Sequence, residues 1–470
     1  MVNKNDVDVY SEQPTSLEPP PRWLMGLILG GVLALVIGIV GGFIAFREVL
    51  LPSQQQRVIA LVPFMENFLP NRSADAYLPT SAPNPNLVVA PEDLLDLTIV
   101  STPLLPTETI PPTSTATSAH TATFAPSATA LPSMTPVVPT SIPIVPTPSA
   151  ASAVTLPPDA HLYGFQPVIQ TWNNCGPATI TMSLSYYAWG EDQEYAASFL
   201  RPDGEDKNVT PREMVRFVNE QTGVRAITRM GGTLELLKAF LANGFPVIVS
   251  IGYAPEGEDW LGHYRAIVGY SDLRQVFFAY DSYLGTGENA DGITMPYDEM
   301  TEVWQHFNRN FIVLYESARE SEVAEILGER SDTNRAAELA LETAQQEARS
   351  DPRNGFAWFN MGTALVALGR YEDAAVAYDR ARQLNLPFRM LWYQFGPYEA
   401  YFNVGRYDDV LALVTANLNN GGEYVEETHY WQGQAYLALG RNTEAAEAFR
   451  RAVAGNQFYD TAQEALAALG

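Results

Sequence analysis

Cysteine is the rarest residue in this chain, which has 470 residues and a single thiol, Cys175. One thiol cannot form a disulfide within the chain, and it cannot provide the set of thiolates that a structural zinc site requires. Histidine is also scarce: the chain has 5, and no two of them stand at metal-ligand spacing. We therefore expect neither a metal ion nor another cofactor.

Basic side chains are under-represented as well. The chain has 28 Lys and Arg against 54 Asp and Glu, which gives a formal net charge of -26. Nucleic acids and anionic lipid headgroups are bound mainly through Lys and Arg. The acidic balance therefore argues against both as main partners, and it is typical of a soluble protein surface.

Charged residues are missing from one long apolar run, residues 23–46 (WLMGLILGGVLALVIGIVGGFIAF). As a helix that rises 1.5 Å per residue, this run extends ~36 Å, enough to cross a bilayer. It is too long for the apolar part of a signal peptide, and no small-residue cleavage site precedes Arg47. The sequence therefore predicts one transmembrane helix at 23–46, preceded by a cytoplasmic tail at 1–22.

Charge is also nearly absent from residues 101–158, where Pro, Ser, Thr and Ala dominate. Such a segment buries too little apolar surface to offset chain entropy, and its prolines keep it extended. We expect residues 47–156 to form a disordered stalk. Positive charges flank the apolar run on both sides, so their distribution does not decide which end of the helix faces the cytoplasm. The orientation is therefore inferred from the short N-terminal tail and the stalk. They favour a single-pass protein of the cell membrane with its bulk outside the cytoplasm.

Residues 157–318 have the composition of a globular domain. Helical patterns come first, and runs rich in Val, Ile, Phe and Tyr follow. The expected helices are 177–189, 210–223 and 233–244, and the expected strands are 246–253, 263–270, 275–283 and 310–315. Helices followed by antiparallel strands indicate an α+β domain.

The last third of the chain repeats itself. The motifs LGRYEDA, VGRYDDV and LGRNTEA recur at 368–374, 404–410 and 439–445. These copies resemble the tetratricopeptide repeat, in which small residues let paired helices pack closely. The middle copy is weaker, because Tyr398 and Val410 replace small residues. The resemblance implies an all-α repeat domain at 333–470 that binds a protein partner; self-association or a spacer role is the alternative.

The single cysteine lies in the stretch QTWNNCGPA, at the start of a predicted helix. Proline is tolerated best in the first turn of a helix, so Pro177 places Cys175 at the positive end of the helix dipole. A thiol in that position, beside an imidazolium, reacts as a thiolate. Gln170, five residues earlier, and the Cys175 backbone N–H would together donate to the oxyanion of a tetrahedral intermediate.

A base and its orienting carboxylate are predicted on two neighbouring strands. His263 opens one strand, Asp281 ends the next, and a hairpin-length loop at 271–274 joins them. Pairing outward from this loop places His263 opposite residue 281 or 282. At that separation the carboxylate can orient the imidazole ring.

This set of residues resembles the active site of papain-type cysteine peptidases. It resembles more narrowly the family of bacteriocin-processing (double-glycine leader) peptidases, the C39-like family, in its stand-alone form. The resemblance covers about 157–318 and rests on Gln170 with NNCGPA, and on GFPVIVSIGY, GHYRAIVGY and YDSY. It implies a papain-like α+β fold with Cys175 as nucleophile, His263 as general acid and base, Asp281 as orienter and Gln170 in the oxyanion hole.

Two departures from the family pattern stand in the sequence. The glutamine precedes the cysteine by five residues, where six is common in such enzymes. No transporter or ATPase segment accompanies the domain, so leader cleavage coupled to export is not implied.

The leading hypothesis is a membrane-anchored, extracytoplasmic cysteine peptidase that acts on a peptide or protein substrate. Its repeats would recruit that substrate or another protein, and the two folded units would fold independently. A lone cysteine is often an inert buried residue, and a fold can be kept for binding alone. A catalytically inactive surface-binding or scaffold protein therefore stays open as an alternative. So does a thiol-dependent amidase or acyltransferase, which would use the same residues.

Overall fold

The predicted membrane helix and stalk fall largely on residues that the structure does not describe. The residues that the computed structural model describes are 156–254, 259–470, the short segments 77–81 and 89–97, and isolated positions between 30 and 65. Most of 23–46 and residues 98–155 lie outside this set. Among the described residues, no helix has both the length and the apolarity that crossing a membrane requires.

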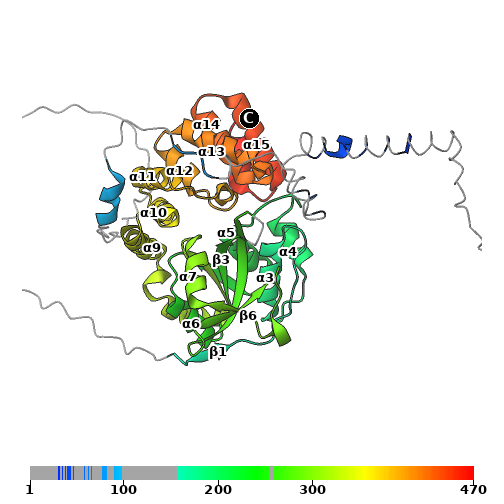
Figure 1. The fold of residues 1–470 in the computed structure, drawn as a ribbon, viewed down its shortest axis with the longest axis vertical. Coiled ribbons are helices and arrows are strands. Elements are labelled where there is room, and N and C mark those ends of the chain that lie inside the picture. Colours follow the sequence, from blue (N-terminus) through cyan, green and yellow to red (C-terminus); the bar gives the residue numbers. More distant parts are fainter. Residues whose placement is uncertain are drawn as a thin grey trace, which may run out of the picture.

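The first folded unit is an α+β domain built on one antiparallel sheet (Figure 1). The strands are β1 (Asp159–His161), β2 (Arg225–Arg229), β3 (Val247–Tyr253), β4 (Leu261–Ser271), β5 (Val276–Asp281), β6 (Ile293–Pro296) and β7 (Phe311–Tyr315). Their order is β2-β7-β3-β4-β5-β6, and β1 pairs with β4 outside this path. The long strands β3 and β4 lie in the middle, where both faces are covered, and their residues are buried almost without alternation.

Helices cover both faces of this sheet. They are α3 (Cys175–Ser185), α4 (Gln193–Leu200), α5 (Pro211–Gln221), α6 (Leu234–Ala242), α7 (Tyr297–Gln305) and α8 (Glu320–Leu327). Helices α3, α4 and α5 share a buried cluster with Ile248 of β3, whereas α6, α7 and α8 pack with Val247 and Val249 on the other face. Successive strand residues point to opposite faces, which is why one strand serves two cores.

The second folded unit is helical, and pairs of antiparallel helices make up its repeats. Its helices are α9 (Thr333–Ser350), α10 (Gly355–Ala367), α11 (Tyr371–Arg382), α12 (Gly396–Asn403), α13 (Tyr407–Asn419), α14 (Glu426–Ala438), α15 (Asn442–Gly455) and α16 (Asp460–Ala467). Gly362 lets α10 approach α11, because a Cβ there would lie 2.7 Å from the Tyr378 ring. Gly433 does the same for α14 against Phe449. In the weaker middle copy, Tyr398 is fully buried and fills the space itself.

Two parts of the predicted stalk pack against the helical unit, and the expectation of a disordered stalk does not hold for them. The backbone N–H of Leu78 donates to the carbonyl of Leu386 at 2.8 Å. Leu94 is fully buried in the same core as α10 and α11. The Gln345 side chain donates to the carbonyls of Leu94 and Leu97, at 2.8 and 3.0 Å. Apolar residues at 78 and 94 thus anchor segments 77–81 and 89–97.

The helical unit arches over one edge of the α+β domain (Figure 1). At one end of the contact, the His306 ring stacks on Phe356 of α10 with ring centroids 3.7 Å apart. In the middle, Tyr393 covers the backbone of Gly262, where a Cβ would lie 3.0 Å from the tyrosine ring. Trp260 of the α+β domain belongs to the buried cluster of the helical unit. The two units therefore share a core, which the expectation of independent folding does not include.

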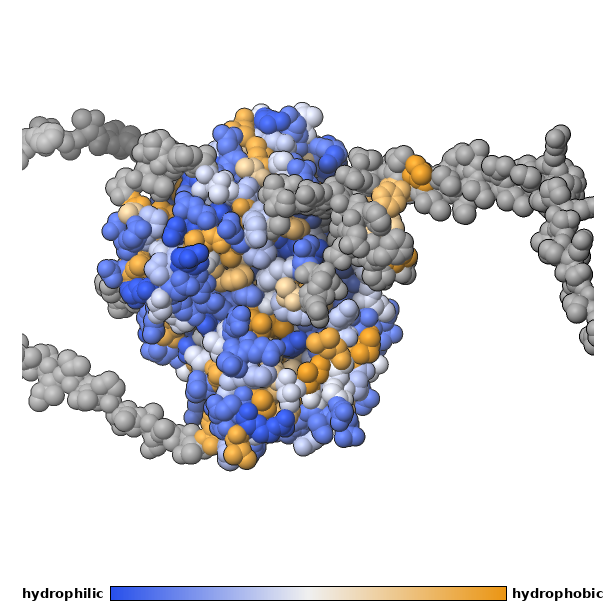
Figure 2. Space-filling model, viewed as in Figure 1, coloured by the Kyte–Doolittle hydropathy of each residue, from blue (hydrophilic) through white to orange (hydrophobic). Residues whose placement is uncertain are grey.

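At the other end, polar groups join α5 to α14 and α15. The Asn456 amide donates to Glu426 at 2.7 Å and to Glu213 of the α+β domain at 3.2 Å. The Asn208 amide donates to Glu427 at 3.3 Å. Carboxylates from both units thus meet in a buried interface. The outer surface is different: on the face seen in Figure 2, hydrophilic residues dominate, and apolar residues form small separate patches.

Candidate active site

Cys175 is the first residue of α3, two residues before the predicted start of the helix at Pro177. Asn173 before it has a φ of 55°, a left-handed conformation that asparagine adopts more readily than most residues. The Asn174 amide donates to Gln193 at 2.8 Å and its oxygen accepts from Arg201 at 2.9 Å. These buried contacts hold the loop that presents the thiol. Sequence reasoning missed Gln193 and Arg201, because no motif marks them.

His263 lies near the start of β4 and is 5% exposed. Its Nε2 is 2.9 Å from Oδ1 of Asp281, and Cys175 lies near enough to contribute to the pKa of the ring. Burial alone would lower the pKa of His263, but the hydrogen bonds and negative charges of Asp281 and Cys175 raise it to about 9. The imidazole therefore has a carboxylate that orients it and a thiol nearby, as a general acid and base requires.

Asp281 is fully buried at the end of β5, yet it stays ionised because four groups donate to it. Oδ1 accepts from His263 and from the backbone N–H groups of Tyr283 and Leu284, at 2.7 and 3.0 Å. Oδ2 accepts from Nε of Arg265 at 2.7 Å. Burial by itself would raise the pKa of Asp281, but the hydrogen bond from His263 and the neighbouring positive charges lower it below its usual value.

The predicted register of the hairpin is wrong, although the predicted contact exists. Arg265, not His263, lies opposite Asp281 in the β4–β5 ladder. The turn occupies residues 272–275, one residue later than predicted, and a register shift between Ile267 and Gly269 then moves the pairing back by one residue. His263 therefore reaches Asp281 diagonally across the two strands, over a separation that a long side chain can span.

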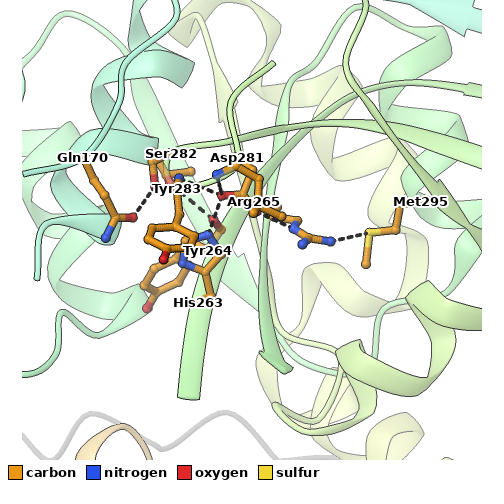
Figure 3. Close-up of polar contacts among 10 residues, drawn as sticks. Gln170, His263, Tyr264, Arg265, Asp281, Ser282, Tyr283 and Met295 are labelled. Carbon is orange, nitrogen blue, oxygen red and sulfur yellow. Dashed lines mark hydrogen bonds and ion pairs between the residues drawn. The ribbon is translucent and has the colours of Figure 1, made fainter. Parts of the chain in front are cut away.

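Gln170 is placed by Ser282, a residue that the sequence did not single out. The Gln170 backbone N–H donates to the Ser282 carbonyl at 2.8 Å. The Ser282 hydroxyl donates to Oε1 of Gln170, also at 2.8 Å. Figure 3 shows the amide oxygen of Gln170 turned toward Ser282 and its nitrogen turned away. The nitrogen is therefore the end of the amide that can donate to a reacting group.

Two other histidines among the described residues, His306 and His429, make their contacts elsewhere. His306 packs at the contact with the helical unit, where burial lowers its pKa to about 4. His429 lies in α14. Within the described part of the chain, no group of three or more His, Cys, Asp or Glu side chains is arranged to hold a metal ion. The chemistry that this geometry offers is that of a thiol with an imidazole base.

Comparison with known proteins follows the same division of the chain. Residues 162–311 match the family model described as Peptidase_C39 like family. This segment is a C39-like peptidase domain. Residues 355–386 and 426–454 match models of the tetratricopeptide repeat, so repeats follow the C39-like domain. The family resemblance inferred from the motifs is thereby confirmed for both parts. A search of curated proteins found no match to the chain.

Three solved structures are similar to part of this chain, and each covers 33% of it. A C39-like peptidase from Bacillus anthracis is 14% identical, is covered over 96% of its length and gives a TM-score of 0.27. The double-glycine-motif protease of an AMS/PCAT transporter, in complex with its leader peptide, is 18% identical, with 92% covered and a TM-score of 0.23. The peptidase domain of Streptococcus ComA, a bifunctional ABC transporter, is 16% identical, with 99% covered and a TM-score of 0.25.

Proposed function

We propose that the C39-like domain is an active cysteine peptidase with Cys175 as its nucleophile. The observation that carries this proposal is the environment of His263, whose Nε2 lies 2.9 Å from the buried Asp281 carboxylate and whose pKa is raised by Asp281 and by the nearby Cys175. A histidine kept only for the core would not need a buried carboxylate and a thiol at once. A raised pKa keeps the imidazolium populated beside the thiolate, which is the reactive form of the pair.

In the proposed reaction, the Cys175 sulfur attacks the carbonyl carbon of a peptide bond while His263 holds the thiol proton. The S–C bond forms, and the carbonyl oxygen takes up negative charge that the Gln170 amide and the Cys175 N–H stabilise. The C–N bond then breaks, and His263 gives its proton to the leaving amine. Water attacks the resulting thioester, His263 accepts a proton from it, and cleavage of the S–C bond releases the acid and restores the thiol.

Apolar side chains beside this site support a peptide as the substrate. Ile169 and Trp172 flank Gln170, and Tyr283 and Leu284 follow the Asp281–Ser282 pair. All four are exposed large apolar residues. The Gln170–Ser282 hydrogen bonds join the two segments that carry them. Exposed apolar side chains gathered near a nucleophile provide a contact surface for apolar residues of a bound peptide.

The repeats are part of the same proposal, although some of their surface contacts the C39-like domain of the same chain and is not open to a second protein. Repeats of this kind mediate contacts between proteins. Here α10 and α14, the first helices of two repeats, contact the C39-like domain of the same chain. A second protein, whether substrate or partner, would therefore bind repeat surfaces outside this contact. We further propose that residues 23–46 anchor the chain in the cell membrane with both folded units outside the cytoplasm, on the strength of the apolar run and the Ser/Thr/Pro-rich segment.

An electrophilic probe tests the central claim, because Cys175 is the only thiol of the chain. A peptidyl vinyl sulfone should label the unaltered chain, and labelling should be lost in Cys175→Ala and strongly slowed in His263→Ala. Peptide-library digestion followed by mass spectrometry should then show new termini that Cys175→Ala does not produce. Absence of labelling would leave the domain a binding scaffold. Labelling without peptide cleavage, but with turnover of non-peptide amides, would favour an amidase or acyltransferase.

A further inference from the structure

We propose that Ser282 is a positioning residue that fixes the Gln170 side-chain amide as a donor in the oxyanion hole. The inference rests on the peptidase function proposed above. It concerns a residue that is not among the predicted catalytic residues, and it gives a reason for the partly buried polar contact between two segments that lie far apart in sequence.

The geometry shows a two-point connection between the segments. The Gln170 backbone N–H donates to the carbonyl of Ser282, and the Ser282 hydroxyl donates back to the Gln170 side chain, both at 2.8 Å. Ser282 is fully buried, so water does not compete for its hydroxyl. The backbone hydrogen bond fixes the position of Gln170, and the side-chain hydrogen bond fixes the rotation of its amide.

The rotation matters because the two ends of a glutamine amide have opposite hydrogen-bonding properties. With Oε1 bound by Ser282, the two N–H groups on Nε2 remain for a developing oxyanion. A rotation by 180° would turn the carbonyl oxygen toward the oxyanion, and two electron-rich oxygens would repel each other. The serine hydroxyl thus selects the catalytically useful state of the glutamine.

The short segment that carries Ser282 also carries Asp281, the carboxylate that orients His263. Ser282 directly follows Asp281, and the backbone N–H and carbonyl of Asp281 pair with those of Gly285 at 3.0 and 2.8 Å. Asp281 in turn contacts His263 and Arg265. One tight turn therefore positions both the imidazole base and the oxyanion donor (Figure 3).

A double-mutant cycle between Gln170 and Ser282 tests the proposal on the full chain. The probe substrate is the p-nitrophenyl ester of N-acetylglycine, whose acylation of Cys175 needs the oxyanion hole. Gln170→Ala should reduce kcat/KM by about 10²–10³-fold, the usual cost of one oxyanion donor. Ser282→Ala should reduce it by about tenfold or more, mainly through kcat. The double variant should be no slower than Gln170→Ala, because the serine acts only through the glutamine.

A second readout separates positioning from general support of the fold. Alkylation of Cys175 by iodoacetamide passes through no oxyanion, so its rate and pH profile should be the same in Ser282→Ala and the unaltered chain. Ser282→Thr keeps the hydroxyl and should recover most of the ester hydrolysis. Ser198→Ala, which removes an exposed serine hydroxyl of α4 that donates only to the Tyr195 carbonyl, serves as the matched control and should hydrolyse the ester normally.

Three results would overturn the inference. Ester hydrolysis in Ser282→Ala at the unaltered rate, with Cys175→Ala inactive, removes the role of Ser282 and leaves the peptidase proposal intact. A full additional loss from Ser282→Ala in the Gln170→Ala background shows that the serine acts by another route. Ester hydrolysis by Cys175→Ala at the unaltered rate refutes the peptidase function and the role of Ser282 together.

Discussion

Arg265 lies directly opposite Asp281 in the β4–β5 ladder, and its Nε donates to Oδ2 of that carboxylate at 2.7 Å. Both side chains are buried, and the guanidinium is the only cation that contacts Oδ2 among the described residues. The pair leaves Oδ1 to His263 and two backbone N–H groups. The orientation of the His263 imidazole thus depends on the ion pair between Arg265 and Asp281.

Replacing Arg265 by Met should therefore destabilise the C39-like domain and impair activity together. Loss of one partner leaves the Asp281 charge buried and incompletely compensated, which costs about 3–5 kcal/mol in such pairs. Urea unfolding and ester hydrolysis measure the two effects. In the double variant Arg265→Met/Asp281→Asn the orphan charge is gone, so stability should partly return while hydrolysis stays low. Equal stability of the two variants would contradict this account.

The pH dependence of thiol reactivity should follow His263. Its pKa, raised to about 9 in the folded protein, lies above the unfolded value of 6.5. The charged pair therefore contributes stability that is fully present below pH 6.5 and is lost as the pH rises through 9. Iodoacetamide should alkylate the unaltered chain at an appreciable rate at pH 6, and much more slowly in His263→Ala. The two rates should converge above pH 9.

The control for this measurement is His429→Ala, which removes a histidine of α14 away from the thiol. Its alkylation profile should match the unaltered chain. If the alkylation rate of the unaltered chain rises with pH as that of an ordinary free thiol does, the His263 imidazolium does not activate Cys175.

The contact between the two folded units should weaken as the pH rises. Burial, and then neighbouring carboxylates, raise the pKa of Glu426 from 4.5 to about 8, and the pKa values of Asp206, Glu213 and Glu427 are raised as well. Arg201 beside Asp206 and Arg216 beside Glu213 offset this only in part. The folded state holds extra protons, so this stability is present below pH 4.5 and is lost through pH 8.

Urea unfolding of the full chain at several pH values between 5 and 9 measures this loss. Glu426→Gln keeps the shape of the side chain and the acceptor for Asn456, and it cannot ionise. It should flatten the pH dependence and be more stable than the unaltered chain at pH 8.5. Glu464→Gln, an exposed residue of α16, is the matched control and should leave the slope unchanged. If unfolding stability falls with pH as steeply in Glu426→Gln as in the unaltered chain, groups other than Glu426 cause the pH dependence.

Truncation after Ala318 should damage the C39-like domain. The cut exposes Trp260, which is 9% exposed in the full chain, and removes Phe356 from the His306 ring. It also uncovers the backbone beside His263, where Tyr393 packs on Gly262. The fragment should melt at a lower temperature and associate in gel filtration. A monomeric fragment with unchanged alkylation kinetics would show that the two units fold independently after all.

Membrane topology is testable on intact cells. If residues 23–46 span the membrane once, with the bulk of the chain outside, added protease should release a soluble fragment that begins between residues 101 and 158. The Ser/Thr/Pro-rich composition of that segment makes it the preferred site of cleavage. Full protection in intact cells, together with cleavage after lysis, would reverse the proposed orientation.

Local signals in the sequence were sufficient for the helix that carries the nucleophile and for the central strands. Pro177 and the turn residues before Cys175 place the start of α3 within two residues of its actual position, because these residues restrict backbone angles locally. The apolar runs of β3, β4, β5 and β7 are also local signals, because Val, Ile, Phe and Tyr are enriched in buried strands. Strands β1, β2 and β6 are short, and their pairing partners, not their composition, make them strands.

By itself, the sequence determined which residue types stand at the site and in which order, since one thiol, one strand histidine and one strand-end aspartate leave few combinations. Only the tertiary structure decided how they meet. A register shift inside β4 moved Arg265 opposite Asp281 and made the His263 contact diagonal. The contacts of Ser282 with Gln170, and of Asn456 with Glu213, join residues 112 and 243 positions apart. Packing of the whole chain creates such pairs, because hydrogen-bonding partners at that distance leave no periodicity or local motif in the sequence.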